Sequence, residues 1–128
     1  MNKFQATVKE IKSVNNLNIV KFDFTGISLS MMSLELNNDI QVGKQVELTT
    51  KATHVAIAKD FTGEISYSNQ LQSEIISIEN GELLSSIKMK INDTILESII
   101  TKDSSDRMGL RVGDKVTAFI KANELSIC

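Results

Sequence analysis

The sequence repeats one pattern, and this repetition restricts the possible folds more than any other feature. Residues 42–58 and 112–128 both open on Val-Gly, reach a second Val at the same spacing, and continue through Lys-Ala to an Ile in register. The stretches 2–11 and 69–78 also match, and each starts at an Asn. Self-similarity over so long a period indicates a duplicated structural unit. Polar positions that recur without serving a core are therefore candidates for duplicated site positions.

The composition is that of an ordinary globular protein. Of 128 residues, 41% are hydrophobic, and no apolar run reaches the length of a membrane span. The start of the chain at Met1 has no apolar segment, so we expect no signal peptide and a cytoplasmic location. The single cysteine, Cys128, excludes an intrachain disulfide.

Charge and aromatic content argue against a nucleic-acid binder. Residues 1–60 hold seven Lys and six acidic residues, a balance of +1, whereas residues 61–128 hold five Lys, two Arg and ten acidic residues, a balance of −3. The net charge of −2 leaves no basic stripe for a phosphate backbone. Five Phe and one Tyr supply few stacking surfaces. We expect neither a nucleic acid nor a membrane as partner.

Alternation of apolar and polar residues predicts a chain made mostly of β-strands. Turn signals at Thr25-Gly26 and Asn92-Asp93 predict a hairpin in each half. A fifth strand in each half is expected after Lys51-Ala52-Thr53 and Lys121-Ala122-Asn123. The other strands are expected at 4–11, 19–24, 27–32 and 46–50, and at 71–78, 87–91, 95–100 and 116–120.

One short helix is expected in each half, at 102–109 and at the matching stretch 33–39. The first has an Asp or Ser for an N-cap and Gly109 for the position after the helix. Five short strands and one helical turn in about sixty residues predict a small closed or nearly closed barrel. The boundary is expected near Gly63, which divides the chain into repeats 1–60 and 61–128. The absence of proline and of a Gly/Ser linker predicts that the two repeats pack together.

Residues 69–128 carry a set of features that resembles the TOBE/Mop module. These are Asn69-Gln70-Leu71 after Ser66, Ile99 to Ser104 before the helix, Gly109-Leu110-x-x-Gly113-Asp114-x-Val116, and Ile120-Lys121-Ala122. Residues 2–58 resemble the same module more weakly, through Asn2, Val8, Ile11, Val42-Gly43, Val46 and Lys51-Ala52-Thr53. Together the two halves are similar to the tandem di-Mop proteins.

The resemblance implies an all-β fold with short helical turns, built as tandem OB-like five-stranded β-barrels. It implies a protein that is not an enzyme and that binds molybdate or tungstate in the cytoplasm for molybdenum storage, buffering or homeostasis. It also implies a homo-oligomer, with a trimer favoured and a dimer as the alternative. The marginal core of a sixty-residue barrel and its edge strands agree with assembly.

A tetrahedral oxyanion accepts hydrogen bonds only, so its site must supply N–H and O–H donors. The resemblance and the duplicated Lys-Ala turns select the candidate residues. They are Lys51, Ala52, Thr53, Lys121, Ala122 and Asn123, with Ser66, Ser68, Asn69, Thr101, Ser104 and Asn2. Ser68 stands where the family usually has an Arg, and Asn123 stands where it has a Ser. The structural alternatives are solvated strand ends for the two lysines, an ordinary turn for Ser66 and Asn69, and helix capping for Thr101 and Ser104.

Two other functions remain open from the sequence. One is an anion-sensing regulatory module that acts on a transport ATPase or a transcription regulator, although the chain has neither an ATPase motif nor a helix-turn-helix. The other is an OB-type interaction domain. His54, the single histidine, has no metal-ligand pattern around it and is expected at an exposed or interfacial position of a strand.

Overall fold

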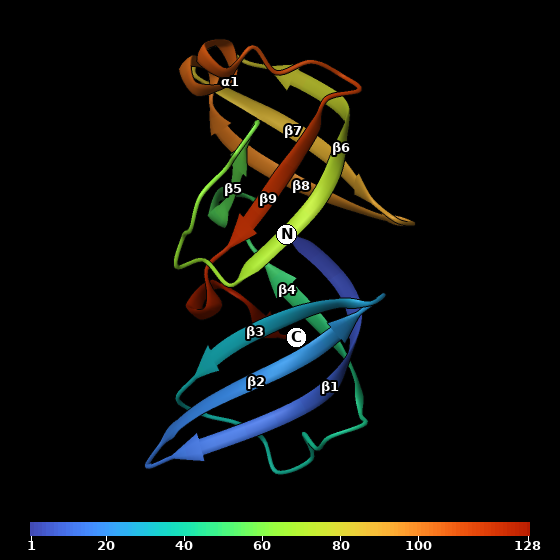
Figure 1. Ribbon diagram of the computed structural model, residues 1–128, viewed down its shortest axis with the longest axis vertical. Coiled ribbons are helices and arrows are strands. Elements are labelled where there is room, and N and C mark those ends of the chain that lie inside the picture. Colours follow the sequence, from blue (N-terminus) through green and yellow to red (C-terminus); the bar gives the residue numbers. More distant parts are fainter.

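The computed structural model describes residues 1–128 as two curled five-stranded antiparallel sheets stacked end to end (Figure 1). The first half contains β1 (Asn2–Val14), β2 (Leu17–Phe24), β3 (Ile27–Ser33), β4 (Gln45–Thr50), the 3-10 turn η1 (Ala52–His54) and β5 (Val55–Ala58). The second half contains β6 (Asn69–Asn80), β7 (Leu84–Ile91), β8 (Thr94–Thr101), α1 (Lys102–Met108), β9 (Lys115–Ile120), η2 (Ala122–Glu124) and β10 (Ser126–Ile127). No helix is long and apolar enough to cross a membrane.

The two halves exchange their fifth strands. One sheet has the strand order β10-β4-β1-β2-β3 and the other has β5-β9-β6-β7-β8. The green strand β5 thus lies beside β9 in the upper sheet of Figure 1, and the C-terminal end lies among the strands of the lower sheet. The sequence predicted a fifth strand after each Lys-Ala turn, but the periodicity did not predict which sheet it joins.

The predicted hairpins are confirmed, and so is the chemistry of their turns. Strand β2 pairs with β3 and β7 pairs with β8. Thr25, Gly26 and Asn92 have φ values of 47°, 89° and 53°, the left-handed conformation that tight hairpin turns need. Each long first strand also carries a bulge at the same repeat position, between Val8 and Glu10 and between Ile75 and Ser77.

The helix expected in the second half is confirmed, and the one expected at 33–39 is absent. Helix α1 begins after Thr101, which caps it in place of the expected Asp or Ser, and ends at Gly109 in the left-handed conformation. Asn69 follows Asn2 by 67 positions, whereas Val112 follows Val42 by 70. The segment from Asn2 to Val42 is therefore three residues shorter than the segment from Asn69 to Val112, a difference of nearly one helical turn. Its segment 34–43 forms turns between β3 and β4.

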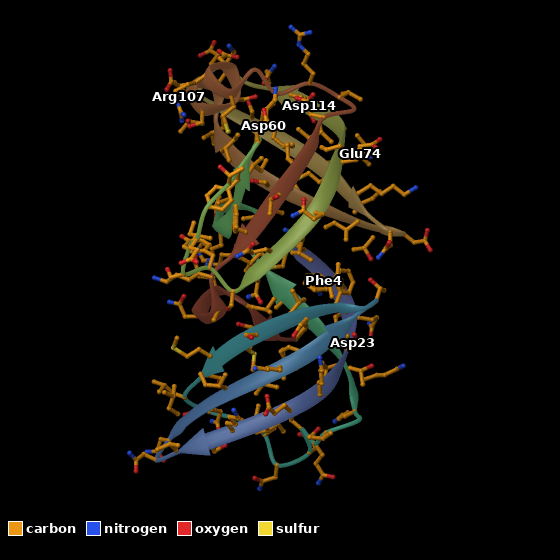
Figure 2. The ribbon with its side chains drawn as sticks, in the orientation of Figure 1. Phe4, Asp23, Asp60, Glu74, Arg107 and Asp114 are labelled. Carbon is orange, nitrogen blue, oxygen red and sulfur yellow. The ribbon has the colours of Figure 1, made fainter.

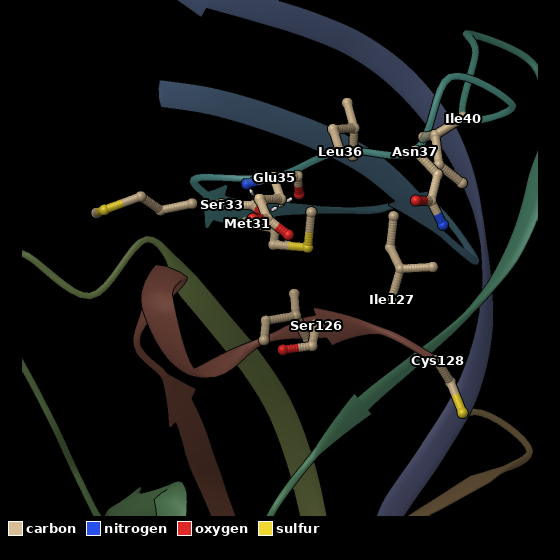
Figure 3. Close-up of a pocket in the computed structure, with 11 residues that line it drawn as sticks. Met31, Ser33, Glu35, Leu36, Asn37, Ile40, Ser126, Ile127 and Cys128 are labelled. Atoms are coloured by element: carbon tan, nitrogen blue, oxygen red, sulfur yellow. Dashed lines mark hydrogen bonds between the residues drawn. The ribbon is translucent and has the colours of Figure 1, made fainter. Parts of the chain in front are cut away.

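A hollow of about 300 Å³ lies at the position in the first half that corresponds to α1 (Figure 3). Its apolar lining includes Met31, Leu36, Ile40 and Ile127, and Glu35 supplies its one carboxylate side chain. The segment 34–43 thus covers this end of the sheet less completely than α1 covers its own. An apolar hollow with a carboxylate offers little to an oxyanion.

A single hydrophobic core extends through both halves. It joins Phe4 and Leu48 of the first half to Leu71 and Ile120 of the second within one cluster. The tips of the two hairpins also touch, because the Asn92 amide donates a 2.8 Å hydrogen bond to the hydroxyl of Thr25. The predicted packing of the two repeats against each other is confirmed.

Candidate functional site

The two Lys-Ala turns have the same backbone conformation and lie where β4 and β9 end, near the middle of the molecule (Figure 1). Lys51 has φ −71° and ψ 142°, and Lys121 has φ −69° and ψ 145°. In each turn the lysine carbonyl accepts a 2.9 Å hydrogen bond from the backbone N–H three residues later. The repeated sequence therefore produces a repeated structure, with each lysine at the start of a 3-10 turn.

The side chains of these turns keep their donors available. Lys51, Lys121, Thr53 and Asn123 are exposed, and none of them forms a side-chain hydrogen bond or an ion pair within the chain. Ala52 lies beneath its turn with 6% of its surface exposed, where a larger side chain would meet the core. An exposed ammonium group beside an unpaired hydroxyl or amide is the kind of donor set that an oxyanion needs.

The structure brings a donor of each half into one hollow. Lys51 from the end of β4 and Asn123 from η2 line the same depression, which has a volume of about 170 Å³. Thr49, Ser126 and Glu124 also line it. The hollow is thus shared between the two halves and does not belong to either repeat alone.

A histidine and a carboxylate meet beside this hollow. His54 Nδ1 lies 3.0 Å from Glu124 Oε2, and the two residues occupy matching positions of η1 and η2. His54 belongs to a 3-10 turn and not to the expected strand, and its partly exposed side chain contacts Glu124 of the other half. The hydroxyl of Thr50 donates a 2.8 Å hydrogen bond to the backbone carbonyl of Glu124. These contacts fix η2 against β4 and place the Glu124 carboxylate against His54, an ion pair only when the imidazole is protonated.

Asn2 and Asn69 use both polar ends of their amides between the halves. The Asn2 amide donates to the carbonyl of Glu97 and accepts from its N–H, both at 2.8 Å. The Asn69 amide donates to the carbonyl of Ser30 at 2.9 Å and accepts from its N–H at 2.6 Å. Both asparagines are buried. They join each first strand to the third strand of the other half, with no polar atom left without a partner.

Thr101 and Ser104 lie at the helix and away from the two turns. Thr101 Oγ1 accepts a 3.1 Å hydrogen bond from the Ser104 N–H, which is the capping interaction. The Ser104 hydroxyl in turn accepts from Arg107 at 3.1 Å. Arg107 lies at the upper end of Figure 2, whereas β4 ends near the middle. Helix capping accounts for both residues.

Ser66 and Ser68 are exposed in the linker 59–68, and neither hydroxyl is hydrogen-bonded. Strand pairing sets Asn69 opposite Ile120, so Ser68 and Lys121 are the next positions of the same two chains. The segment that the family resemblance marks thus runs past the second lysine turn. The structure does not bring Ser66 or Ser68 into the hollow that contains Lys51.

Comparison with known proteins gives this arrangement its context. The family model of the TOBE domain matches residues 65–127. Molybdenum-pterin-binding protein 1 of Clostridium pasteurianum is 30% identical over 64 residues, which cover 49% of this chain and 94% of that protein. The chain belongs to the TOBE/Mop family. The family resemblance predicted from the sequence is confirmed.

The tandem form of the fold is confirmed by a solved structure. The cytoplasmic molybdate-binding protein ModG, in a crystal form with molybdate bound, superposes on this TOBE/Mop protein with a TM-score of 0.93. The two are 26% identical, and the match covers 98% of this chain and 94% of ModG. The predicted all-β, OB-like architecture therefore holds over nearly the whole molecule.

A longer protein also contains part of this sequence pattern. The molybdenum import ATP-binding protein ModC of Brucella abortus is 30% identical over 105 residues, which cover 81% of this chain. This TOBE/Mop protein spans only 28% of the length of ModC.

Most residues around the hollow were not predicted from the sequence as site residues. Thr49, Thr50, Glu124 and Ser126 line it but lack counterparts of the same type in the other half. Recurrence between the halves marks the candidate residues in the sequence, and these positions do not recur. The alternation of β4 could have placed Thr49 on the outer face, because Val46, Leu48 and Thr50 face inward.

Proposed function

We propose that this protein binds molybdate or tungstate through its two Lys-Ala turns and serves molybdenum storage, buffering or homeostasis in the cytoplasm. The observation that carries the proposal is the duplicated turn with free donors, one copy of which shares a hollow with a donor of the other half. The likeness to ModG and to molybdenum-pterin-binding protein 1 supports the same ligand. We infer a binding protein and not an enzyme.

We assign the direct contacts to Lys51 and Asn123 at one turn, and to Lys121 with Thr53 at the other. Ala52 and Ala122 let the turns stay compact beneath the anion. Ser66 and Ser68 are secondary candidates near Lys121. Asn2, Asn69, Thr101 and Ser104 are engaged elsewhere, and we give them a structural role.

We further infer that the protein assembles into a homo-oligomer, a trimer first and a dimer second. The turns are open to solvent, and one chain offers few donors to each of them. A neighbouring subunit would complete the cage. Anion binding would then stabilise the assembly by mass action, because only the assembled form holds the whole site.

Native mass spectrometry and isothermal titration test the proposal together. We expect saturable binding of molybdate and tungstate, weaker binding of sulfate and phosphate, and no binding of a short oligonucleotide. Replacing Lys51 or Lys121 with Ala should cost on the order of 2 kcal/mol at its own site, about thirtyfold in affinity. Lys88→Ala is the matched control, because Lys88 is exposed on β7 without an ion pair.

The outcome that contradicts this assignment is wild-type affinity and stoichiometry in Lys51→Ala, Lys121→Ala and the double variant. The two lysines would then be solvated strand ends. A wild-type chain that gives no heat with molybdate would contradict the proposed ligand itself. A monomer at tens of micromolar, with and without anion, would contradict the assembly.

A regulatory module of a transport ATPase is the second candidate, favoured by the match to part of ModC. In that case the chain should bind a purified molybdenum-import ATPase in an anion-dependent way. Storage requires no such partner. Co-sedimentation with the ATPase, with and without molybdate, separates the two roles.

A further inference from the structure

The residue two positions before each lysine has a different chemical character in the two halves. Thr49 of β4 pairs with Lys3 on one side and with Ser126 of the exchanged strand β10 on the other. Phe119 of β9 pairs in the same way with Gln70 and with Ala56 of the exchanged strand β5. The same place, two residues before the lysine, therefore holds a hydroxyl in one half and an aromatic ring in the other.

In the second half, Phe119 is covered by other aromatic side chains. Phe119 is 2% exposed, and the rings of Phe61 and Tyr67 lie over it with centroids 5.4 Å and 6.0 Å away. Both rings belong to the linker 59–68 between β5 and β6. The outer face that leads to Lys121 is thus filled by three aromatic side chains.

In the first half, a hollow lies beside Thr49, and the hydroxyl of Thr49 lacks a hydrogen-bond partner. Thr49 lines the hollow with Lys51 and Asn123. Its Oγ1 is the one buried side-chain nitrogen or oxygen of the protein without a hydrogen-bond partner. A buried hydroxyl without a partner is costly, and native proteins rarely keep one unless a ligand, an ion or water completes it.

The chemistry of the hollow indicates what completes this hydroxyl. Lys51, Asn123 and Ser126 offer an ammonium, an amide and a hydroxyl, all of which can donate. Glu124 also lines the hollow, with its Oε2 3.0 Å from His54 Nδ1. A small oxyanion would accept a hydrogen bond from Thr49 after a rotation of its side chain, which an apolar ligand could not do.

We propose that the two lysine turns are unequal sites, and that Thr49 is an anion-binding residue of the stronger one. The turn at Lys51 holds the tetrahedral oxyanion with help from Thr49, whereas the turn at Lys121 lacks this donor and binds the anion more weakly. The inference rests on the proposed function and adds the order of the two sites.

Titration of the full-length protein with molybdate tests the order of the sites. Thr49→Val keeps the shape of the side chain and removes the donor, and Thr49→Phe copies the residue of the other half. We expect Thr49→Val to weaken the tighter class of sites about tenfold, as loss of a hydrogen bond to a charged ligand does. Thr49→Phe should abolish that class. Thr117→Val, which removes a β9 hydroxyl that donates to Gln72 away from both turns, is the control for binding.

Melting without ligand separates a binding role from a structural one. Because the hydroxyl has no partner in the chain, Thr49→Val should melt at or above the wild-type temperature while it binds molybdate more weakly. Lys51→Ala should lose the tighter class of sites, and Lys121→Ala should lose the weaker class.

Two results would overturn the inference and leave the proposed function intact. One is wild-type molybdate affinity in Thr49→Val together with lost affinity in Lys51→Ala. The other is loss of the tighter class in Lys121→Ala alone. A wild-type protein that does not bind molybdate at all would overturn both proposals, and the same titration would show it.

Discussion

Asn2 and Asn69 illustrate how one residue type at a repeated position can hold two halves together. Each side chain forms a pair of hydrogen bonds with one backbone position of the other half, Glu97 for Asn2 and Ser30 for Asn69. An amide suits this role because it carries a donor and an acceptor side by side. The pairing uses the free edge of a third strand, which would otherwise present unpaired backbone groups.

Asn69→Ala should lower the free energy of unfolding by about 1–3 kcal/mol, because Ser30 loses a donor and an acceptor at a buried contact. Urea unfolding measures the change. Asn38→Ala, at an exposed turn position whose side chain forms no hydrogen bond, is the control and should cost less than about 0.5 kcal/mol. Equal urea midpoints for Asn69→Ala and the wild type would show that the hydrogen bonds between Asn69 and Ser30 do not stabilise the fold.

At the scale of elements, the second half has a helix whose C-terminus is bound by a lysine, and the first half has no such helix. The linker residue Lys59 reaches the end of α1, where its ammonium donates to the carbonyls of Met108 and Gly109 at 3.3 Å and 3.2 Å. The same group lies 3.3 Å from Asp114, whose carboxylate also accepts from the Arg111 N–H. A cation at a helix C-terminus is favourable, and here it also secures the turn before β9.

The pKa of Asp114 is lowered from its ordinary value of 3.8, first by the Arg111 N–H and then by Lys59. A lowered pKa means that the carboxylate stabilises the fold above pH 3.8, and that this stabilisation is lost as the pH falls through the lowered pKa. Asp114→Asn should therefore melt a few degrees below the wild type at pH 7.

The difference between Asp114→Asn and the wild type should disappear in strong acid, as followed by circular dichroism. Asp93→Asn, at an exposed hairpin tip, is the control and should melt with the wild type at neutral pH. A gap for Asp114→Asn that persists unchanged at pH 2 would show that the carboxylate charge does not matter.

At the scale of the whole molecule, the exchanged strands make the two halves interdependent. Strand β5 completes the second sheet and β10 completes the first, so neither half has its own fifth strand. Joining the two halves by the linker 59–68 makes the exchange intramolecular.

Cutting the linker should therefore leave the two pieces associated. Gly63 is exposed, with φ 118° and open space around it, so a protease recognition sequence inserted there should disturb little. After cleavage we expect the two fragments to co-elute in gel filtration at micromolar concentration and to separate only in denaturant. Fragments that separate under native conditions would contradict the strand exchange. An uncleaved sample of the same variant is the control.

The sequence by itself determined the elements and their repetition. Alternation predicted the strands, Thr25-Gly26 and Asn92-Asp93 predicted the hairpin turns, and the duplicated Lys-Ala segments located the two turns with free donors. These features depend on local chemistry, such as which face of a strand is apolar and which residue accepts a positive φ. Local chemistry can be read from neighbours in the chain.

Only the tertiary structure decided the pairing of β5 and β10, the role of Asn69 and the difference between Thr49 and Phe119. A period of two identifies the buried face of a strand but not the edge it joins, because either sheet offers the same backbone donors and acceptors. The sequence is compatible with Asn69 as a turn residue, and only the structure pairs its amide with the backbone of Ser30. Thr49 becomes distinctive only when η2 brings Asn123, and β10 brings Ser126, to the same hollow from the far end of the chain.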